Sequence, residues 1–126
     1  MKKIALFIYA LAIWACQSDG EPVKTYQVKY EVVTSSGKWH GEYITEAGEK
    51  VCICTASQLE ATGWTNQFNV TKRPFILHID ATTSEASFGT PDAPDVTTNI
   101  YVDNKLVSAN TNNWAKGVAS SDYTIQ

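Results

Sequence analysis

Two cysteines separated by a single residue are the most conspicuous reactive side chains in the sequence. Cys52 and Cys54 lie in an apolar run. On a regular strand they would share a face, with Cα atoms near the ~6.8 Å upper limit for a disulfide and side chains pointing in parallel. We therefore interpret them as two small buried thiols. A zinc site would need further ligands, so His40 or His78 would have to converge on the pair.

Histidine and carboxylates supply two other combinations that could do chemistry. His78 and Asp80 share a strand face, but no strained Gly-x-Ser-x-Gly turn supplies a nucleophile for a hydrolase triad. Glu85, Asp92 and Asp95 could offer oxygens to calcium, but they lack the Asp-x-Asp-x-Asp-Gly spacing. We interpret these three as parts of a solvated loop. The sequence predicts no catalytic residue, no metal site and no cofactor.

The remaining cysteine, Cys16, follows a segment with the features of an export signal. Lys2 and Lys3 precede residues 4–15, which carry no charge. That run is too short to span a bilayer core of ~30 Å, which takes about 20 residues. Residues 13–16 (Ile-Trp-Ala-Cys) resemble the lipobox of bacterial lipoproteins. The resemblance implies cleavage before Cys16 and acyl chains, palmitate among them, on its sulfur and amine.

The signal divides the chain into three parts. Residues 1–15 form the expected signal peptide, and residues 16–23 are the lipidated cysteine and a flexible tether in which glycine and proline deny helix and strand. Residues 24–126 remain, which suffice for one domain with a core. The acidic stretch after Cys16 resembles the surface-export signal of Bacteroidetes lipoproteins.

Charge excludes some classes of partner. Once Lys2 and Lys3 are removed, the ten basic residues fall to eight, against thirteen acidic ones. An acidic surface repels phosphate backbones and anionic headgroups. We therefore expect neither nucleic acid binding nor electrostatic adhesion to a membrane.

Apolar and polar residues alternate with a period of two from residue 24 onward, which predicts strands with one buried face. The clearest run is residues 26–32, followed by residues 39–45 and 49–56. Both faces of the third run are apolar, so we expect a central or loop-covered strand there. These three runs should form a meander.

The rest of the chain continues in the same way. Further strands are predicted at residues 64–70, 75–79, 96–102, 105–109 and 118–125. Residues 82–94 lack periodicity and should cross between sheets as a loop, and residues 110–113 are expected to form a second loop. The pattern favours an all-β fold, an antiparallel β-sandwich of seven to eight strands, over a small closed barrel. The expected core consists of Tyr30, Val32, Phe68, Leu77, Ile79, Ile100 and Val102.

A two-residue turn sets the register of the late hairpin. Asp103 and Asn104 both tolerate positive φ, as such a turn requires. The turn would place Val102 opposite Lys105, Tyr101 opposite Leu106, and Ile100 opposite Val107.

Aromatic side chains are numerous for a single core. We expect Trp64 in the core, whereas Trp114, Tyr101 and Trp39 are candidate binding residues, because partly exposed rings often anchor ligands or proteins. Trp114, which follows a run of asparagines, is the best exposed candidate.

Three patches resemble the soluble domain of the MmpS family. They are residues 25–33 (Thr-Tyr-Gln-Val-Lys-Tyr-Glu-Val-Val), 63–68 (Gly-Trp-Thr-Asn-Gln-Phe) and 100–107 (Ile-Tyr-Val-Asp-Asn-Lys-Leu-Val). That family shows a first strand of Val-x-Tyr-Glu-Val type, a tryptophan opening a middle strand and a late Val-Asp-Gly-Lys-Val hairpin, in the same order. The resemblance implies an immunoglobulin-like sandwich and an accessory role beside an exporter.

These observations together predict a lipid-anchored, non-enzymatic module of the bacterial cell envelope. Its expected partners are the membrane, through Cys16, and another envelope protein, with the outer membrane expected rather than the inner. The alternative is a small-ligand or glycan binder that uses the exposed aromatics.

Overall fold

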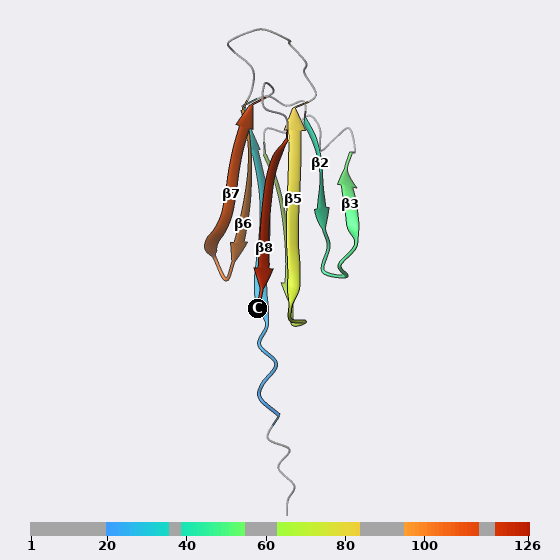
Figure 1. Ribbon diagram of the computed structural model, residues 1–126, viewed down its shortest axis with the longest axis vertical. Helices are drawn as coiled ribbons and strands as arrows, with labels where there is room; N and C mark the ends of the chain where they lie inside the picture. Colours follow the sequence, from blue (N-terminus) through green and yellow to red (C-terminus); the bar gives the residue numbers. More distant parts are fainter. Residues whose placement is uncertain (1–19, 36–38, 55–62, 84–94, 114–117) are drawn as a thin grey trace, which may run out of the picture.

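The computed structural model describes residues 20–35, 39–54, 63–83, 95–113 and 118–126, and their regular secondary structure is all strand (Figure 1). The eight strands are β1 (Tyr26–Thr34), β2 (Trp39–Ile44), β3 (Lys50–Ile53), β4 (Gly63–Val70), β5 (Phe75–Thr83), β6 (Asp95–Val102), β7 (Lys105–Asn113) and β8 (Ala119–Ile125). Among these residues, no helix has the length and apolar character needed to cross a membrane.

The strands form two four-stranded antiparallel sheets, in the orders β4-β1-β6-β7 and β3-β2-β5-β8. This confirms the predicted all-β fold, an antiparallel β-sandwich of eight strands. The expected meander of the first three strands is wrong, because β1 pairs with β4 and β6 while β2 and β3 belong to the other sheet. Alternation of apolar residues sets which face of a strand is buried, and it leaves the choice of partner strand open.

The core lies between the two sheets and follows the predicted alternation. Along β1 and β5 every second side chain is buried. Of the seven predicted core residues, Phe68 and Val102 are only partly buried and pack against the core from its rim, and the rest are fully enclosed. The core also contains one buried polar contact, in which the hydroxyls of Thr98 on β6 and Ser121 on β8 are 2.8 Å apart.

The turn between β6 and β7 has the predicted backbone. Asp103 and Asn104 have φ values of 50° and 64°. Asp103 also binds β1, because its carboxylate accepts the Gln27 amide at 2.9 Å and its own amide donates to the Gln27 carbonyl at 2.8 Å. The turn is therefore fixed on a neighbouring strand as well as by its own sequence.

The register of this hairpin follows the prediction for two pairs only. Val102 opposes Lys105 and Tyr101 opposes Leu106, but a bulge after Ile100 places that residue opposite Ser108 instead of Val107. The extra residue of a bulge leaves the turn geometry intact and shifts everything beyond it.

The structure differs from the sequence expectation for two loops and for one strand. Residues 110–113 are strand rather than loop, since β7 continues to Asn113, which pairs with Asp95. Within the run at residues 49–56, the strand β3 covers only Lys50–Ile53 and lies at the edge of its sheet rather than at the centre; residues 55 and 56 lie outside the described residues. The chain does cross between sheets from β5 to β6, as predicted. Residues 82 and 83 of the expected loop belong to β5 instead, and residues 84–94 lie outside the described residues.

Candidate functional site

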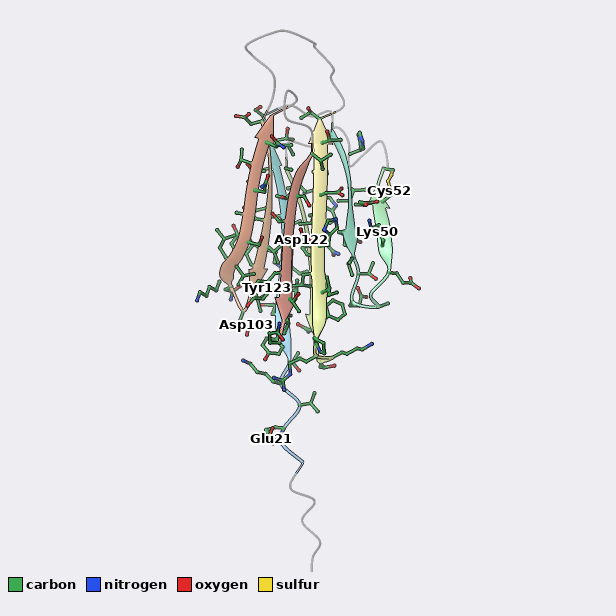
Figure 2. All side chains as sticks on the ribbon, viewed as in Figure 1. Glu21, Lys50, Cys52, Asp103, Asp122 and Tyr123 are labelled. Atoms are coloured by element: carbon green, nitrogen blue, oxygen red, sulfur yellow. A yellow bond between two sulfur atoms is a disulfide. The ribbon has the colours of Figure 1, made fainter. Side chains whose placement is uncertain are left out.

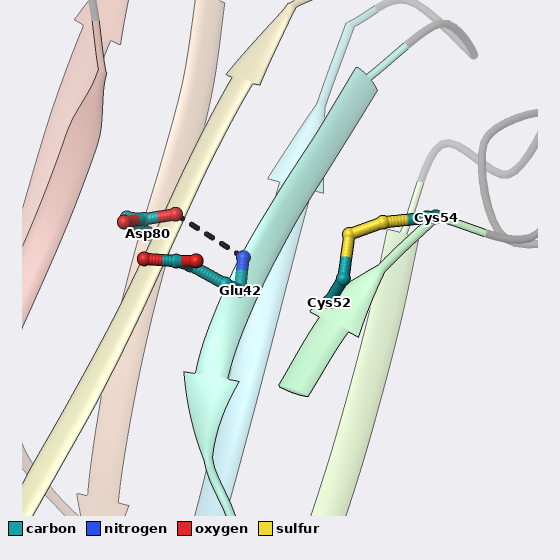
Figure 3. Close-up of a disulfide and its surroundings, with 4 residues drawn as sticks. All are labelled: Glu42, Cys52, Cys54 and Asp80. Atoms are coloured by element: carbon teal, nitrogen blue, oxygen red, sulfur yellow. Dashed lines mark hydrogen bonds between the residues drawn. A yellow bond between two sulfur atoms is a disulfide. The ribbon is translucent and has the colours of Figure 1, made fainter. Parts of the chain in front are cut away.

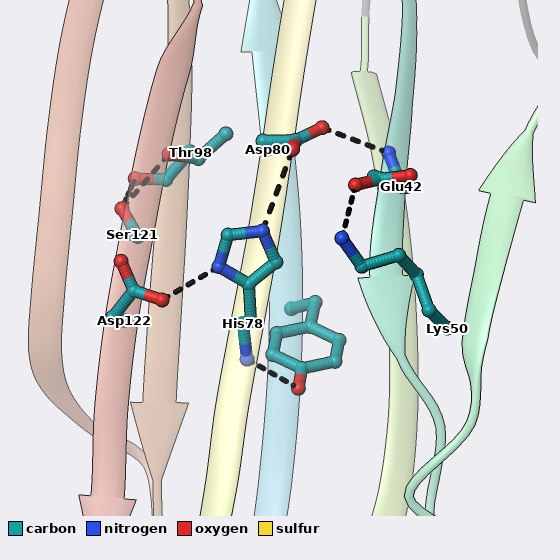
Figure 4. A network of polar contacts seen from close by, with 8 residues as sticks. Glu42, Lys50, His78, Asp80, Thr98, Ser121 and Asp122 are labelled. Atoms are coloured by element: carbon teal, nitrogen blue, oxygen red, sulfur yellow. Dashed lines mark hydrogen bonds and ion pairs between the residues drawn. The ribbon is translucent and has the colours of Figure 1, made fainter.

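Four polar side chains meet on the outer face of the sheet β3-β2-β5-β8. His78 and Asp80 project from β5 and Glu42 from β2 (Figure 4). Asp122 projects from β8 (Figures 2 and 4). Strand pairing brings them together, because Glu42 lies opposite Asp80 and His78 lies opposite Asp122. We call Glu42, His78, Asp80 and Asp122 the outer-face cluster.

The His78 imidazole lies between two carboxylates. Its Nδ1 is 2.6 Å from Oδ1 of Asp122, and its Nε2 is 3.4 Å from Oδ2 of Asp80. The side chains of His78 and Asp80 keep 20 % and 23 % of their surface exposed, against 67 % for Asp122. The imidazole is thus held by a short contact with the exposed Asp122 and a longer contact with the less exposed Asp80.

The backbone of His78 is fixed from inside the sandwich. Its amide donates a hydrogen bond of 3.2 Å to the hydroxyl of Tyr30, a fully buried residue of β1 in the opposite sheet. Burial is the main cause that raises the pKa of Tyr30 above its ordinary value, whereas the hydrogen bond from His78 acts in the opposite direction.

Glu42 is bound to Asp80 through its backbone and to Lys50 through its side chain. The Glu42 amide donates to Oδ1 of Asp80 at 3.1 Å, and Lys50 Nζ is 2.6 Å from Oε1 of Glu42 (Figure 4). The hydrogen bond from Lys50 is the main cause that lowers the pKa of the Glu42 carboxyl, and it raises the pKa of Lys50. Both groups are therefore held in their charged forms.

Close approach of β2 and β5 depends on Gly41. A Cβ at this position would lie against the Asp80 carbonyl oxygen and would also crowd Ala81 Cα at 3.2 Å. No side chain fits there without a shift of the backbone. The glycine next to Glu42 thus lets β2 approach β5 closely where Glu42 and Asp80 lie opposite each other.

Cys52 and Cys54 form a disulfide beside the cluster, and both are exposed (Figure 3). The expectation of two buried thiols is wrong. Strand β3 ends at Ile53, so Cys54 departs from strand geometry and the Cα atoms are 5.5 Å apart. That separation lies within the usual range of disulfides. Cys52 faces Glu42 across the strand pair, and the two cysteines are accounted for without a metal.

Trp39 is not a surface anchor. It is fully buried, and its ring centroid is 6.5 Å from that of Trp64. Trp64, which the sequence places in the core, is only partly buried and packs against the core. The expectation for the two tryptophans is therefore reversed: Trp39 is the core residue, and Trp64 is the more exposed of the pair. Trp114 lies outside the described residues.

Tyr101 is half-buried on the outer face of the other sheet, far in the fold from Trp39. Its hydroxyl donates to Glu31 Oε2 at 2.9 Å, and the Lys29 ammonium lies 4.0 Å from its ring centroid. The hydrogen bond to Glu31 raises the pKa of Tyr101. The structure therefore does not bring Tyr101 and Trp39 together, and it covers one face of the Tyr101 ring.

His78 and Asp80 can be recognised as candidates from the sequence, whereas Glu42 and Asp122 cannot. Glu42 and Asp122 alternate with inward-facing residues, so the sequence predicts that both point outward. Their distance along the chain from His78 does not predict that they lie beside it. Of the acidic residues considered for calcium, Asp95 begins β6, whereas Glu85 and Asp92 lie outside the described residues, as does Cys16.

Comparison with known proteins gives no further guide to the site. No protein-family model matches the chain, and no curated protein matches it.

Proposed function

We propose that this chain is a lipid-anchored, non-enzymatic module of the bacterial cell envelope that binds or assists another envelope protein, with a transporter as the leading class of partner. The observation that carries the proposal is the lipobox-like segment ending at Cys16, followed by a tether. Residues 20–25 belong to no strand and are exposed, and they leave β1 at one end of the sandwich (Figure 1).

The tether sets how far the domain can reach. Residues 17–23, fully extended at ~3.3–3.6 Å each, span roughly 25 Å. Two or more acyl chains on Cys16 would hold the protein stably, where one chain gives only marginal attachment. The sandwich would then work within a short distance of the bilayer, consistent with a partner that is itself a membrane protein.

The outer-face cluster supports a non-enzymatic role. Both ring nitrogens of His78 face carboxylate oxygens, on Asp80 and Asp122. A histidine that activates a nucleophile has one nitrogen on a hydroxyl or thiol and the other on a carboxylate. The arrangement around His78 resembles an ion-pair network or a ligand set instead.

The resemblance to the MmpS soluble domain supports a transporter partner, because proteins of that family act beside exporters. The acidic tether supports display at the outer membrane rather than the inner. The alternative, a small-ligand or glycan binder, loses support because Trp39 is buried and the Tyr101 ring is covered by Lys29. Trp114 is then the remaining aromatic candidate.

Anchoring is tested by Cys16→Ser. We expect the variant to leave the membrane fraction, since no acyl chain can be attached without the cysteine. Ser18→Ala, two residues further along, is the matched control and should stay membrane-bound. If Cys16→Ser still sediments with membranes at wild-type levels, the lipoprotein proposal is wrong.

The partner is tested by crosslinking the acylated protein in intact cells, followed by affinity purification. Recovery of one envelope complex, reduced in Cys16→Ser cells, is the expected result. If the domain retains glycan or lipid and no protein, the ligand-binding alternative replaces the proposal, and Trp114→Ala should then abolish retention.

A further inference from the structure

We propose that Glu42, His78 and Asp80 form a binding site for a divalent transition-metal ion of the Zn²⁺ type, with Asp122 as the residue that orients the imidazole. The proposal concerns the sandwich alone and does not depend on lipid anchoring. One donor atom from each of the three ligand residues lies within 4.8 Å of the other two. The donors come from two adjacent strands at the same level of the sheet (Figure 4).

The distance between two of the ligand atoms, on His78 and Asp80, already suits a bound metal ion. Ligands bound at about 2.0–2.2 Å to a tetrahedral ion lie roughly 3.4 Å apart. His78 Nε2 and Asp80 Oδ2 are 3.4 Å apart, which is longer than the usual ~2.7–3.2 Å of an N–H···O hydrogen bond. Closing the set around an ion requires movement mainly of the Glu42 side chain, which is partly exposed.

The hydrogen bond to Asp122 sets the direction of Nε2, the His78 atom that would bind the ion. With a proton on Nδ1, at 2.6 Å from Asp122 Oδ1, the lone pair of Nε2 points at the Asp80 carboxylate. Two electron-rich atoms then face each other, and a cation between them removes the repulsion. The order carboxylate, imidazole, metal is the common arrangement at protein zinc sites, where the outer carboxylate fixes the tautomer.

The remaining contacts hold the ligands in place. The Glu42 amide occupies Oδ1 of Asp80, which leaves Oδ2 directed at His78. The Tyr30 hydroxyl fixes the His78 backbone from the core. Ligands that are oriented before binding lose less conformational entropy when the ion arrives.

The donor types select the class of ion. One imidazole nitrogen and two carboxylates suit Zn²⁺ and similar first-row ions, whereas Ca²⁺ and Mg²⁺ prefer sets made of oxygen alone. A hollow of about 250 Å³ adjoins Glu42 and Asp80. It is smaller than the roughly 300–1,000 Å³ of organic ligand sites. Its lining includes His40 as well as Glu42 and Asp80 but not His78, so a variant of His40 is needed to tell the two imidazoles apart as ligands.

Lys50 is a built-in competitor for the ion. Its ammonium is 2.6 Å from Glu42 Oε1 and would repel a cation bound to the same carboxylate. Binding should therefore displace Lys50 or use the second oxygen of Glu42. Replacing Lys50 with a neutral residue should strengthen metal binding, an effect opposite to that of damage to the fold.

Zn²⁺ titration of the untagged full chain by isothermal calorimetry tests the proposal. We expect one ion per chain, with binding lost in His78→Gln and in Asp80→Asn. His40→Gln is the matched control, because His40 is the only other histidine of the chain and lies on the same sheet face. Its affinity should stay within about twofold of wild type. In ¹⁵N spectra of the two imidazoles, Zn²⁺ should shift Nε2 of His78 and leave His40 unchanged.

Two further variants separate a metal site from an ion-pair network. Asp122→Asn should weaken Zn²⁺ binding by about 10- to 100-fold, the usual effect of removing such an orienting carboxylate. Lys50→Met should tighten it. Absence of saturable Zn²⁺ binding in the wild type, retention of binding in His78→Gln, loss of it in His40→Gln, or weaker binding in Lys50→Met would each overturn the proposal.

Discussion

The hydroxyl of Tyr30, in the middle of β1, accepts a hydrogen bond from the backbone amide of His78 across the interior of the sandwich. Pairing of β2 with β5 ends at the pair of Tyr43 and Ile79, so it does not include His78, the next residue of β5 beyond that pair. The tyrosine hydroxyl therefore provides a hydrogen-bond acceptor for the His78 amide, which lies just beyond the end of the β2–β5 ladder. One buried side chain of the first sheet thus positions the histidine on the outer face of the second.

Removing this hydroxyl should destabilise the fold. Tyr30→Phe leaves the His78 amide without its partner in a partly buried environment, which should cost about 1–3 kcal/mol of unfolding free energy. Urea denaturation measures the loss, and amide exchange at His78 should accelerate. Tyr26→Phe is the control, since the Tyr26 hydroxyl is involved in an exposed contact of 3.4 Å with Arg73 and its loss should cost less than about 0.5 kcal/mol. Equal stability of the two variants would contradict the role assigned to Tyr30.

Alkaline pH should weaken the fold through Tyr30 and Tyr101. Burial raises the pKa of Tyr30 and the bond to Glu31 raises that of Tyr101, both from an ordinary value of 10.0. A raised pKa means that the folded state favours the neutral phenol. This stabilisation is complete below pH 10.0 and is lost as the pH rises above it.

Absorbance at the phenolate wavelength provides the measurement for this pH dependence. Tyr30 should ionise only together with unfolding, and Glu31→Gln should lower the pKa of Tyr101 toward the ordinary value while leaving Tyr30 unchanged. Ionisation of every tyrosine near the ordinary value, with the fold still intact by circular dichroism, would refute the expectation.

Gly41→Ala should be strongly destabilising. The new Cβ would collide with the Asp80 backbone, which cannot move aside as a side chain can, and we expect a loss of about 2–4 kcal/mol. Gly63→Ala on β4 is the matched control, because its nearest neighbour, the Val32 carbonyl, is at an ordinary 3.7 Å. That variant should be neutral or slightly more stable. Thermal melts of both variants would show the contrast, and a wild-type melting temperature for Gly41→Ala would show that β2 and β5 do not approach as described.

The buried pair Thr98 and Ser121 should behave non-additively. Ser121→Ala removes a hydroxyl that contacts Thr98 Oγ1 at 2.8 Å and donates to the Thr98 carbonyl at 3.0 Å, so it should cost about 1–3 kcal/mol. Thr98→Val should cost a similar amount alone. The double variant should lose less than the sum of the two, because no hydroxyl is then left buried without a partner. Strict additivity in a double-mutant cycle would exclude the interaction.

The alternation of residues determined which side chains face inward on most strands. The pattern alone predicts Leu77 and Ile79 in the core and places His78 on the opposite face of the strand, and the structure agrees. The period of two is a local property, so the sequence of a single strand contains it. The turn at Asp103 and Asn104 is equally local, since it depends on the φ values that these two residues tolerate.

The tertiary structure alone decided which strands pair and what the outer-face cluster contains. Glu42 and Asp80 are 38 residues apart, and His78 and Asp122 are 44 apart. Pairing over such separations depends on how whole faces pack, and no local pattern records it. The same holds for the end of β3, which lets Cys52 bond to Cys54, and for the burial of Trp39. The sequence by itself therefore determined the fold class and which face of a strand each side chain occupies. The assembly of the two sheets determined which side chains become neighbours, and hence the chemistry that the outer-face cluster can do.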